Sequence, residues 1–358
     1  MWKQVAIVLL SSAVVLAACQ PGQRQGTAEN TPVPTPSPRS TVVPEAPQRT
    51  VEPYRTDLPP SPRCFPFEEV SPISFMPDST HLVIKERAGV RILNLETLEE
   101  ETLTASQELV SATLSPDGEL LAWSLMDNTI QLFRTDDQTL VKTMEGHTLP
   151  TFKLRFSSTG DRLFSASSDT WVRIWNRDGE ALDAFQPTGA NDLPNDIRGI
   201  GISPDGTLLG SIPFDGPARV WDLTTKKAIA DLGGTGGDVI SDIAFSPDGQ
   251  FVAADQAGHL SLWRTSDWNV LWTDISSMAF AFSPNGRFLA YSDLDSNDVS
   301  FRSLDESQPP GALQGDQFPI YELFYSPDGN WLAAAGAGIR IWRVDTGQLS
   351  YIGKAECP

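Results

Sequence analysis

The chain has 358 residues and a formal net charge of −20, with 26 Lys and Arg against 46 Asp and Glu. That length is enough for one large all-β domain or two average domains, each with a buried core. The excess of acids would repel phosphate backbones and anionic head groups, so nucleic acid is not an expected partner.

Residues 1–18 have the pattern of a lipoprotein signal peptide. Lys3 is followed by the apolar run VAIVLLSSAVVLAA and then by Cys19, and this run is too short to span a bilayer. The letters LAAC at 16–19 resemble the bacterial lipobox, whose cysteine receives a lipid before cleavage. The resemblance implies a mature chain that begins at Cys19, carries fatty acyl chains such as palmitate and lies at the cell membrane or outer membrane on the extracytoplasmic side. An ordinary signal peptide with an incidental cysteine is the alternative.

Residues 19–63 are rich in Pro, Thr and Ser and nearly free of large apolar side chains. Such a composition cannot form a core, so we expect a disordered linker that is partly polyproline II. The linker would hold a folded domain, residues 64–358, away from the lipid surface. A docking motif within it is the alternative.

A four-residue turn motif recurs along the folded part. SPDG stands at 115–118, 203–206, 246–249 and 326–329, with the related MPDS at 76–79, SSTG at 157–160 and SPNG at 283–286. Each copy separates two runs of alternating apolar residues, which predicts strand, turn, strand. At 246–249, Pro247 suits a type I turn and Gly249 its left-handed position. The spacings of 39, 42, 46, 43, 37 and 43 indicate a repeat of about 42 residues.

An apolar residue closes the third strand of each repeat and runs in step with the turns. The series is Leu93, Phe133, Trp175, Trp221, Trp263, Phe301 and Trp342. With the motifs VRIWN at 172–176, ARVWDL at 218–223, LSLWRT at 260–265 and IRIWRV at 339–344, the chain from about 67 to 352 resembles the WD-repeat β-propeller family. The resemblance implies an all-β fold, a seven-bladed β-propeller of four-stranded antiparallel blades. Blade one has no Trp, which leaves its completeness open.

The same resemblance implies a structural hydrogen-bonded set in blade three, made of His147, Ser165 or Ser167, Asp169 and Trp175. An aspartate also stands six residues before the aromatic of four repeats, where a carboxylate can accept backbone N–H bonds in a tight turn. These are Asp127, Asp169, Asp215 and Asp295.

Catalytic, cofactor and metal sites are not predicted, so an enzyme is not expected. His147 matches the structural position, and His81 and His259 stand at the starts of strands. The segment GGTGG at 233–237 lacks the Lys and the following helix of a phosphate loop. DLDSND at 293–298 alternates oxygen ligands as a calcium loop does but lacks its Gly and distal Glu, so calcium is an alternative to a solvated hairpin.

Two cysteines, Cys64 and Cys357, remain once Cys19 carries lipid, and they flank the propeller. A closed ring brings its ends together and export permits oxidation, so we expect a disulfide between them. All seven repeats have four strands in sequence, with QLSYIG at 348–353 as the last outer strand, so strand exchange is not expected to close the ring. RTVEPYR at 49–55 as an added edge strand is the alternative.

One face of the propeller should carry the turns between second and third strands and the loops between blades, opposite the SPDG turns. We expect a partner-binding surface there, with aromatic and acidic side chains and the long interblade stretch 186–199. Its candidate residues are Met126, Trp171, Phe214, Asp293, Asp295 and Phe318. Trp171 and Phe214 packing back onto their own blades is an equally strong alternative.

The sequence therefore favours a membrane-tethered interaction module, a monomer that binds a protein or peptide partner in the cell envelope. An enzyme or small-ligand binder with a site at the mouth of the central channel is the alternative function.

Overall fold

The computed structural model describes residues 71–189, 192–234, 242–305, 311–315, 319–336 and 338–354. The predicted lipid site Cys19, the cysteines Cys64 and Cys357, the candidate Phe318 and the segment 49–55 lie outside the described residues.

The described chain forms 28 strands in seven four-stranded sheets, and each sheet contains four consecutive strands. Blades 1 and 2 are β1 Ser71–Phe75, β2 His81–Glu86, β3 Gly89–Asn94, β4 Glu100–Thr104, β5 Leu109–Leu114, β6 Leu120–Leu125, β7 Ile130–Arg134 and β8 Leu140–Met144. Blades 3 and 4 are β9 Thr151–Phe156, β10 Arg162–Ser167, β11 Val172–Asn176, β12 Ala181–Phe185, β13 Ile197–Ile202, β14 Leu208–Pro213, β15 Ala218–Asp222 and β16 Lys227–Gly233.

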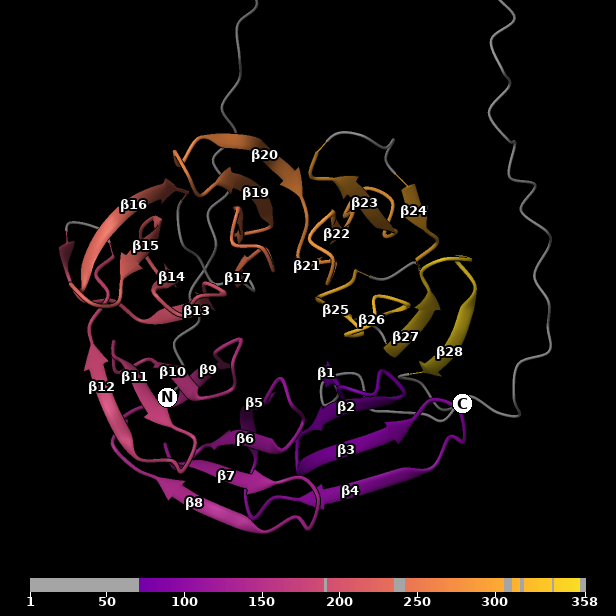
Figure 1. The fold of residues 1–358 in the computed structure, drawn as a ribbon, viewed down its shortest axis with the longest axis horizontal. Helices are drawn as coiled ribbons and strands as arrows, with labels where there is room; N and C mark the ends of the chain where they lie inside the picture. Colours follow the sequence, from indigo (N-terminus) through magenta and orange to yellow (C-terminus); the bar gives the residue numbers. More distant parts are fainter. Residues whose placement is uncertain are drawn as a thin grey trace, which may run out of the picture. The chain divides into compact units, whose positions relative to one another are not determined.

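Blades 5 to 7 continue the same order around the ring (Figure 1). They are β17 Asp242–Phe245, β18 Phe251–Gln256, β19 His259–Arg264, β20 Val270–Ser276, β21 Phe280–Phe282, β22 Phe288–Ser292, β23 Val299–Ser303, β24 Gly311–Leu313, β25 Glu322–Tyr325, β26 Trp331–Ala335, β27 Gly338–Arg343 and β28 Leu349–Lys354. The seven-bladed all-β prediction is confirmed, blade one is a complete sheet, and β28 is the last outer strand, with no strand exchanged between sheets among the described residues. No helix among the described residues is long and apolar enough to cross a membrane.

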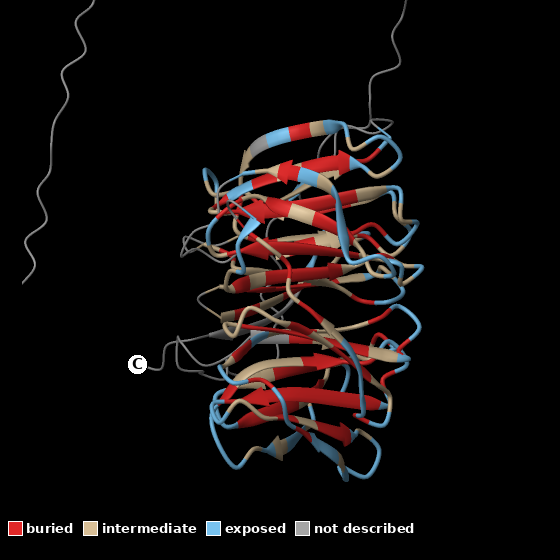
Figure 2. Cartoon of the chain, turned by 90° about the vertical axis from the view of Figure 1, so that its left-hand side faces the viewer, coloured by how far each residue is buried: buried red, intermediate tan, exposed pale blue. Residues whose placement is uncertain are grey.

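The burial of each strand follows its place in the blade. The second strand lies between two neighbouring blades, so both of its faces are apolar, and all six residues of β6 are buried. The outer strand has one face in solvent, and three of the five residues of β12 are exposed. Figure 2 shows the buried strand centres between two layers of exposed loops.

Each SPDG turn is held by its own side chains. In the copy at 246–249, Gly249 has a φ of 71° and its N–H donates to the carbonyl oxygen of Ser246 over 2.8 Å. The Ser246 hydroxyl donates to Asp248 Oδ1 over 2.6 Å and accepts the N–H of Phe251 over 2.9 Å. The predicted left-handed glycine is confirmed. In blade 1, Ser79 takes this conformation with a φ of 60°.

The turns of neighbouring blades also touch one another. An ideal Cβ at Gly118 would lie 2.5 Å from Cδ of Pro77, the proline of the preceding blade. An ideal Cβ at Gly160 would likewise lie 3.4 Å from Cδ of Pro116, and one at Gly249 would lie 3.7 Å from Cδ of Pro204. The repeated motif therefore packs the ring on this face in addition to reversing the chain.

Seven hydrophobic clusters join the seven pairs of adjacent blades. Each places second- and third-strand residues of one blade against the next. The cluster that closes the ring has the same kind of core, with Leu82 and Ile84 of blade 1 against Ile339 and Ile341 of blade 7. Burial of these side chains, at about 25 cal/mol per Å² of apolar area, stabilises the contact between the first and last blades.

Antiparallel order gives the ring two different faces. The SPDG turns and the turns between third and fourth strands lie on one face, which we call the SPDG face. The turns between second and third strands and the interblade loops lie on the other, the loop face. Hydrogen bonds join these two sets of loops, such as Gln107 Nε2 to Asp127 Oδ2 over 2.7 Å and Ser168 Oγ to Asp196 Oδ1 over 2.9 Å.

Candidate functional site

The residues of the implied blade-three set come together under the loop face. His147 Nδ1 lies 2.9 Å from Asp169 Oδ2, and His147 Nε2 lies 2.8 Å from the hydroxyl of Ser165. The Trp175 indole N–H donates to the same hydroxyl over 2.9 Å. Ser167 instead donates to the carbonyl oxygen of Leu149 over 2.9 Å.

This set connects the loop before β9, which carries His147, to β10 with Ser165 and to β11 with Trp175. Burial raises the pKa of Asp169, but hydrogen bonds from His147 and the N–H of Thr148 outweigh it and hold the pKa below its usual range. His147 and Asp169 expose 1% and 5% of their side chains, so they are packing groups that a substrate does not reach. Blade 4 repeats one bond, from the Trp221 indole to Ser211 Oγ over 2.8 Å.

The turn aspartates differ from one another. Asp127 Oδ1 accepts the N–H of Thr129 over 3.0 Å, and Asp169 Oδ1 accepts that of Trp171 over 3.1 Å. In the longer turn between β22 and β23, Asp293 accepts the N–H of Asp295 over 2.9 Å, so Asp293 holds this turn. No group of three or more His, Cys, Asp or Glu suited to a metal occurs among the described residues, including the described parts of 293–298.

Four exposed apolar side chains lie in or beside the loops of the loop face over blades 2 to 4. Met126 is 55% exposed, Leu149 47%, Phe152 36% and Leu193 62%. The predicted Trp171 and Phe214 are half-buried, Asp293 is half-buried and Asp295 is exposed. Sequence reasoning named Met126 and the stretch 186–199 that contains Leu193, but it missed Leu149 and Phe152.

Phe152 is exposed because of a backbone irregularity. The register of β9 against β10 skips Phe152, between Lys153 opposite Ala166 and Thr151 opposite Ser167. Arg198 takes the same position in β13, between Ile197 and Gly199. Bulges re-aim side chains, and they are common at the rims of sheets.

These bulges create a stack of three side chains. The guanidinium carbon of Arg198 lies 4.9 Å from the ring centre of Phe152 and 5.0 Å from that of Phe214. Arg198 Nη2 also lies 2.8 Å from Asp196 Oδ2. Phe214 thus lies against Arg198, which also contacts Phe152 of the neighbouring blade, while part of the Phe214 ring remains in solvent.

Charged side chains of the inner strands β9 and β17, which lie around the centre of the ring in Figure 1, also contact one another. Arg155 Nη2 and Lys153 Nζ of β9 lie 2.7 and 3.1 Å from the same oxygen, Asp242 Oδ2 of β17. Blade 4 lies between them, and its inner strand has Gly199 and Gly201 where blade 3 has Lys153 and Arg155. The two basic side chains therefore pass blade 4 to reach blade 5.

Glu322 of β25 completes what we call the axial cluster: Lys153, Arg155, Asp242 and Glu322. Burial raises the pKa of Glu322, although Lys153, Lys85 and Arg155 oppose that rise. For Asp242, the charges of Arg155 and Lys153 outweigh burial and lower the pKa. Burial lowers the pKa of Lys153 in spite of Asp242.

Sequence reasoning did not single out the axial cluster. A signal was present in the segments KLRF at 153–156, DIAF at 242–245 and ELFY at 322–325, which place charges in otherwise apolar inner strands. The sequence does not show that these segments face one another across the ring.

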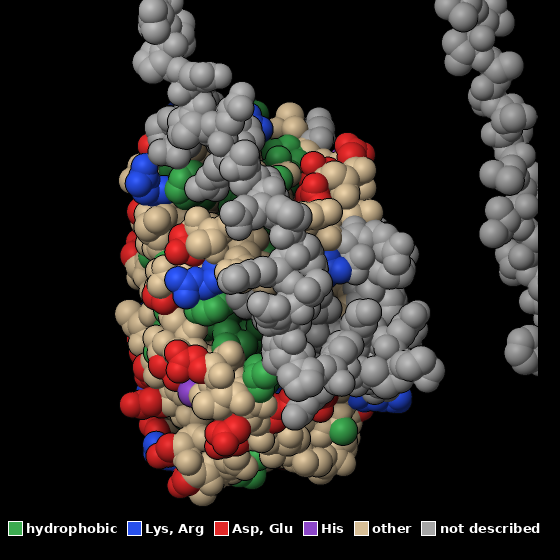
Figure 3. All heavy atoms as spheres, turned by 90° about the vertical axis from the view of Figure 1, so that its right-hand side faces the viewer, with side chains coloured by type: hydrophobic (Ala, Val, Ile, Leu, Met, Phe, Trp, Pro, Cys, Tyr) green, Lys and Arg blue, Asp and Glu red, His purple; other side chains and the backbone are tan. Residues whose placement is uncertain are grey.

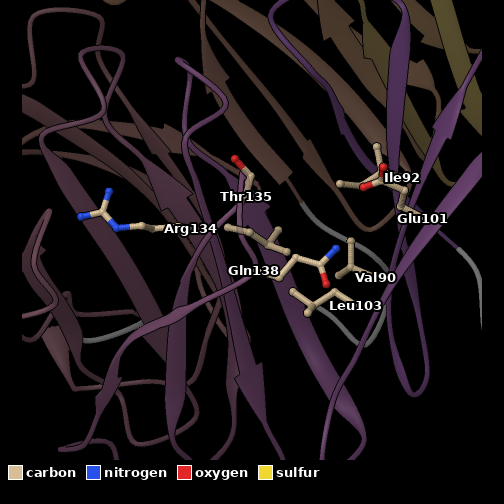
Figure 4. A pocket seen from close by; sticks show the side chains of 8 residues that line it. Val90, Ile92, Glu101, Leu103, Arg134, Thr135 and Gln138 are labelled. Carbon is tan, nitrogen blue, oxygen red and sulfur yellow. The ribbon is translucent and has the colours of Figure 1, made fainter.

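Two hollows elsewhere among the described residues are poor candidates for a site. A crevice between blades 1 and 2, lined by Val90, Leu103 and Gln138, has a free volume of about 10 Å³, and Arg134 extends away from it (Figure 4). That is room for about one water molecule. A hollow of about 390 Å³ on the rim of blade 4 lies over Arg219, which already contacts Asp192 and Asp231 at 2.8 and 3.5 Å.

Comparison with known proteins supports the repeat assignment. The family model "WD domain, G-beta repeat" matches residues 138–176 and 226–264. The chain is 33% identical over 241 residues to WD repeat-containing protein VIP3 of Arabidopsis thaliana, covering 67% of this chain and 64% of that protein. It is 24% identical over 308 residues to Pre-mRNA-processing factor 19 homolog 2 of the same plant, covering 76% of this chain and 56% of that protein.

A third similarity is to Apoptotic protease-activating factor 1 of Rattus norvegicus, with 24% identity over 285 residues, 75% of this chain and 22% of that protein. The chain thus spans less than two thirds of the length of each of these relatives. The matches support the WD40 repeat family for this chain. Propellers of that family are generally non-enzymatic scaffolds and commonly bind protein partners.

Proposed function

We propose that this protein is an interaction module of the cell envelope that binds a protein or peptide partner through the loop face over blades 2 to 4. The observation that carries the proposal is the group of exposed apolar side chains on this face: Met126, Leu149, Phe152 and Leu193. Exposed apolar side chains on a face that also carries exposed polar side chains have the composition of a binding hot spot.

The charge around these anchors specifies the partner's chemistry. Asp127, Glu145 and Asp215 are exposed in the loops and turns of the same blades, whereas Asp192 is paired with Arg219. Arg198 is paired with Asp196, so it does not offset this acidity. Figure 3 shows acidic side chains spread over another described part of the surface. A segment with apolar anchors and flanking Lys or Arg residues is complementary to such a face.

We further propose that the module acts as a monomer on the extracytoplasmic side of the membrane, held by lipid on Cys19 and separated from the bilayer by the linker to residue 63. This part rests on the LAAC motif and on the composition of the linker. Loss of acyl-probe labelling in Cys19→Ser tests the anchor, and labelling of that variant would contradict it.

Crosslinking on intact cells, followed by mass spectrometry of the captured partner, tests the binding face. The variants Phe152→Ala and Leu193→Ala should each weaken binding of the identified partner about tenfold, since loss of an anchor costs more than 1 kcal/mol. They should change the melting temperature little because both side chains reach solvent. Trp171→Ala and Phe214→Ala should also weaken capture.

The matched controls are Leu182→Ala and Ile229→Ala, which are 56% and 44% exposed on the outer strands β12 and β16. They remove apolar area of similar exposure outside the loop face and should leave capture unchanged. Equal capture by Phe152→Ala and by the controls would place the binding surface elsewhere. Asp127→Lys and Asp215→Lys should slow association and reduce its dependence on salt.

A further inference from the structure

The axial cluster carries more positive than negative charge at its centre. Arg155 and Lys153 share one carboxylate, and the second oxygen of Asp242 accepts the N–H of Ile243 over 2.9 Å. Asp242 therefore compensates one of the two basic side chains. A half-buried charge without a partner is costly, because the protein replaces part of its hydration.

Glu322 does not supply the missing negative charge well. Its Oε2 atom is shielded from solvent and accepts no hydrogen bond from the described residues. An ionised carboxylate with such an oxygen loses hydration there without gaining a hydrogen bond, so the neutral form is favoured. The raised pKa of Glu322 agrees with this geometry.

The basic side chains are still accessible along the axis. Lys153 has 22% and Arg155 31% of its side chain exposed. The described hydrogen bond of Arg155 uses Nη2, which leaves its other guanidinium nitrogens for a second acceptor. A guanidinium presents paired donors that match a carboxylate.

We propose that the axial cluster is a binding site for a small monocarboxylate anion, held by Arg155 and Lys153. One negative charge balances the one uncompensated basic group. The protein's net charge of −20 opposes anions in proportion to their valence, which favours a monovalent ligand over a phosphate. This inference is independent of the proposed partner on the loop face.

Titration of the full chain with trifluoroacetate, followed by ¹⁹F NMR at constant ionic strength, tests the site. We expect a saturable change in the ¹⁹F signal that acetate competes away. Arg155→Gln and Lys153→Gln should each weaken binding about tenfold, because a hydrogen bond between charged groups is lost. Lys227→Gln, at an exposed position on β16, is the matched control and should bind like the wild type.

The variant Glu322→Gln distinguishes an anion site from a cation site. Its result does not depend on whether the Arg155 and Lys153 variants fold. Because the neutral form of Glu322 is favoured, glutamine keeps the charge of the site, so trifluoroacetate should bind this variant at least as tightly as the wild type, and the variant should fold because an uncharged amide replaces an uncharged acid. Circular dichroism and a thermal melt verify folding. The proposal is overturned by a folded wild type without saturable binding, by equal effects of Lys227→Gln and Arg155→Gln, or by weaker binding in Glu322→Gln.

Discussion

At the scale of single residues, Asp255 is a buried acid at a strand position where blades 3 and 4 have apolar side chains. It is 1% exposed, and the corresponding residues of blades 3 and 4 are the buried Ala166 and Ile212. Asp255 Oδ1 accepts the N–H of Gly258 over 3.2 Å, while Oδ2 has no partner among the described residues. Burial raises the pKa of Asp255 to about 7, and the nearby charge of Asp242 adds to the rise.

Asp255 should therefore make folding stability depend on pH. The folded state holds this proton up to pH of about 7, whereas the unfolded chain releases it near 3.8. The folded state thus binds more protons in this window, so the free energy of unfolding falls as the pH rises from 4 to 7. Asp255→Asn should remove this fall, which amounts to at most about 4 kcal/mol.

Urea unfolding from pH 4 to pH 8 measures the effect of Asp255→Asn. The variant should match the wild type near pH 4 and exceed it near pH 8. Asp215→Asn, at an exposed position, is the control and should follow the wild-type curve. If the free energies of unfolding of the wild type and Asp255→Asn changed in parallel with pH, Asp255 would have the same pKa in the folded and unfolded states, which would contradict the prediction.

At the scale of elements, the SPDG turn has a local and a tertiary role. Local chemistry explains its shape, since Ser and Asp satisfy the turn's backbone groups and Gly takes the left-handed conformation. The contacts between neighbouring turns come from the ring. They vary with the blade: a Cβ at Gly118 would meet Pro77, whereas a Cβ at Gly206 would meet nothing within 4 Å.

This difference gives a matched pair of variants, Gly118→Ala and Gly206→Ala. Both glycines have similar φ values of 74° and 70°, so each alanine should cost roughly 1 kcal/mol of left-handed strain. Gly118→Ala should lose a further 1 to 3 kcal/mol, roughly, because the new methyl overlaps Pro77 of blade 1. Chemical denaturation of both variants measures the difference, and equal losses would mean that the turns do not support one another.

At the scale of the whole molecule, the ring closes by the same packing that joins every other pair of blades. Leu82 and Ile341 lie in the closing cluster, and the N–H of Asp328 donates to the Ser79 hydroxyl over 3.2 Å on the SPDG face. The side chains across the axis add a second connection, from blade 3 to blade 5. The predicted disulfide between Cys64 and Cys357 would add a covalent closure to this arrangement.

We expect Cys64 and Cys357 to be bonded in the exported protein. In the chain-entropy model, a bond that closes so long a loop stabilises the folded state by roughly 5 to 6 kcal/mol as an upper figure. Non-reducing peptide mapping of the mature protein detects the bond, and the double variant Cys64→Ser, Cys357→Ser should melt at a lower temperature. Two free thiols in material purified from the envelope would contradict the prediction.

The repeat determined the fold from sequence alone. The turn residues, the alternating apolar runs and the closing aromatics act over a few neighbouring residues, and seven copies of one such unit have few ways to bury their apolar faces. The predicted turn at 246–249, the strands on either side and the four consecutive strands per blade are therefore all found in the structure.

The tertiary structure alone decided what lies on the axis and on the loop face. Arg155 and Asp242 are 87 positions apart, and no local pattern relates them until the ring places their strands around one centre. Phe152 and Arg198 depend on strand bulges that shift side chains by one position, which an alternating pattern does not reveal. Interactions between residues close in sequence thus specify the blades, whereas the sites consist of residues from different blades that come together when the ring closes.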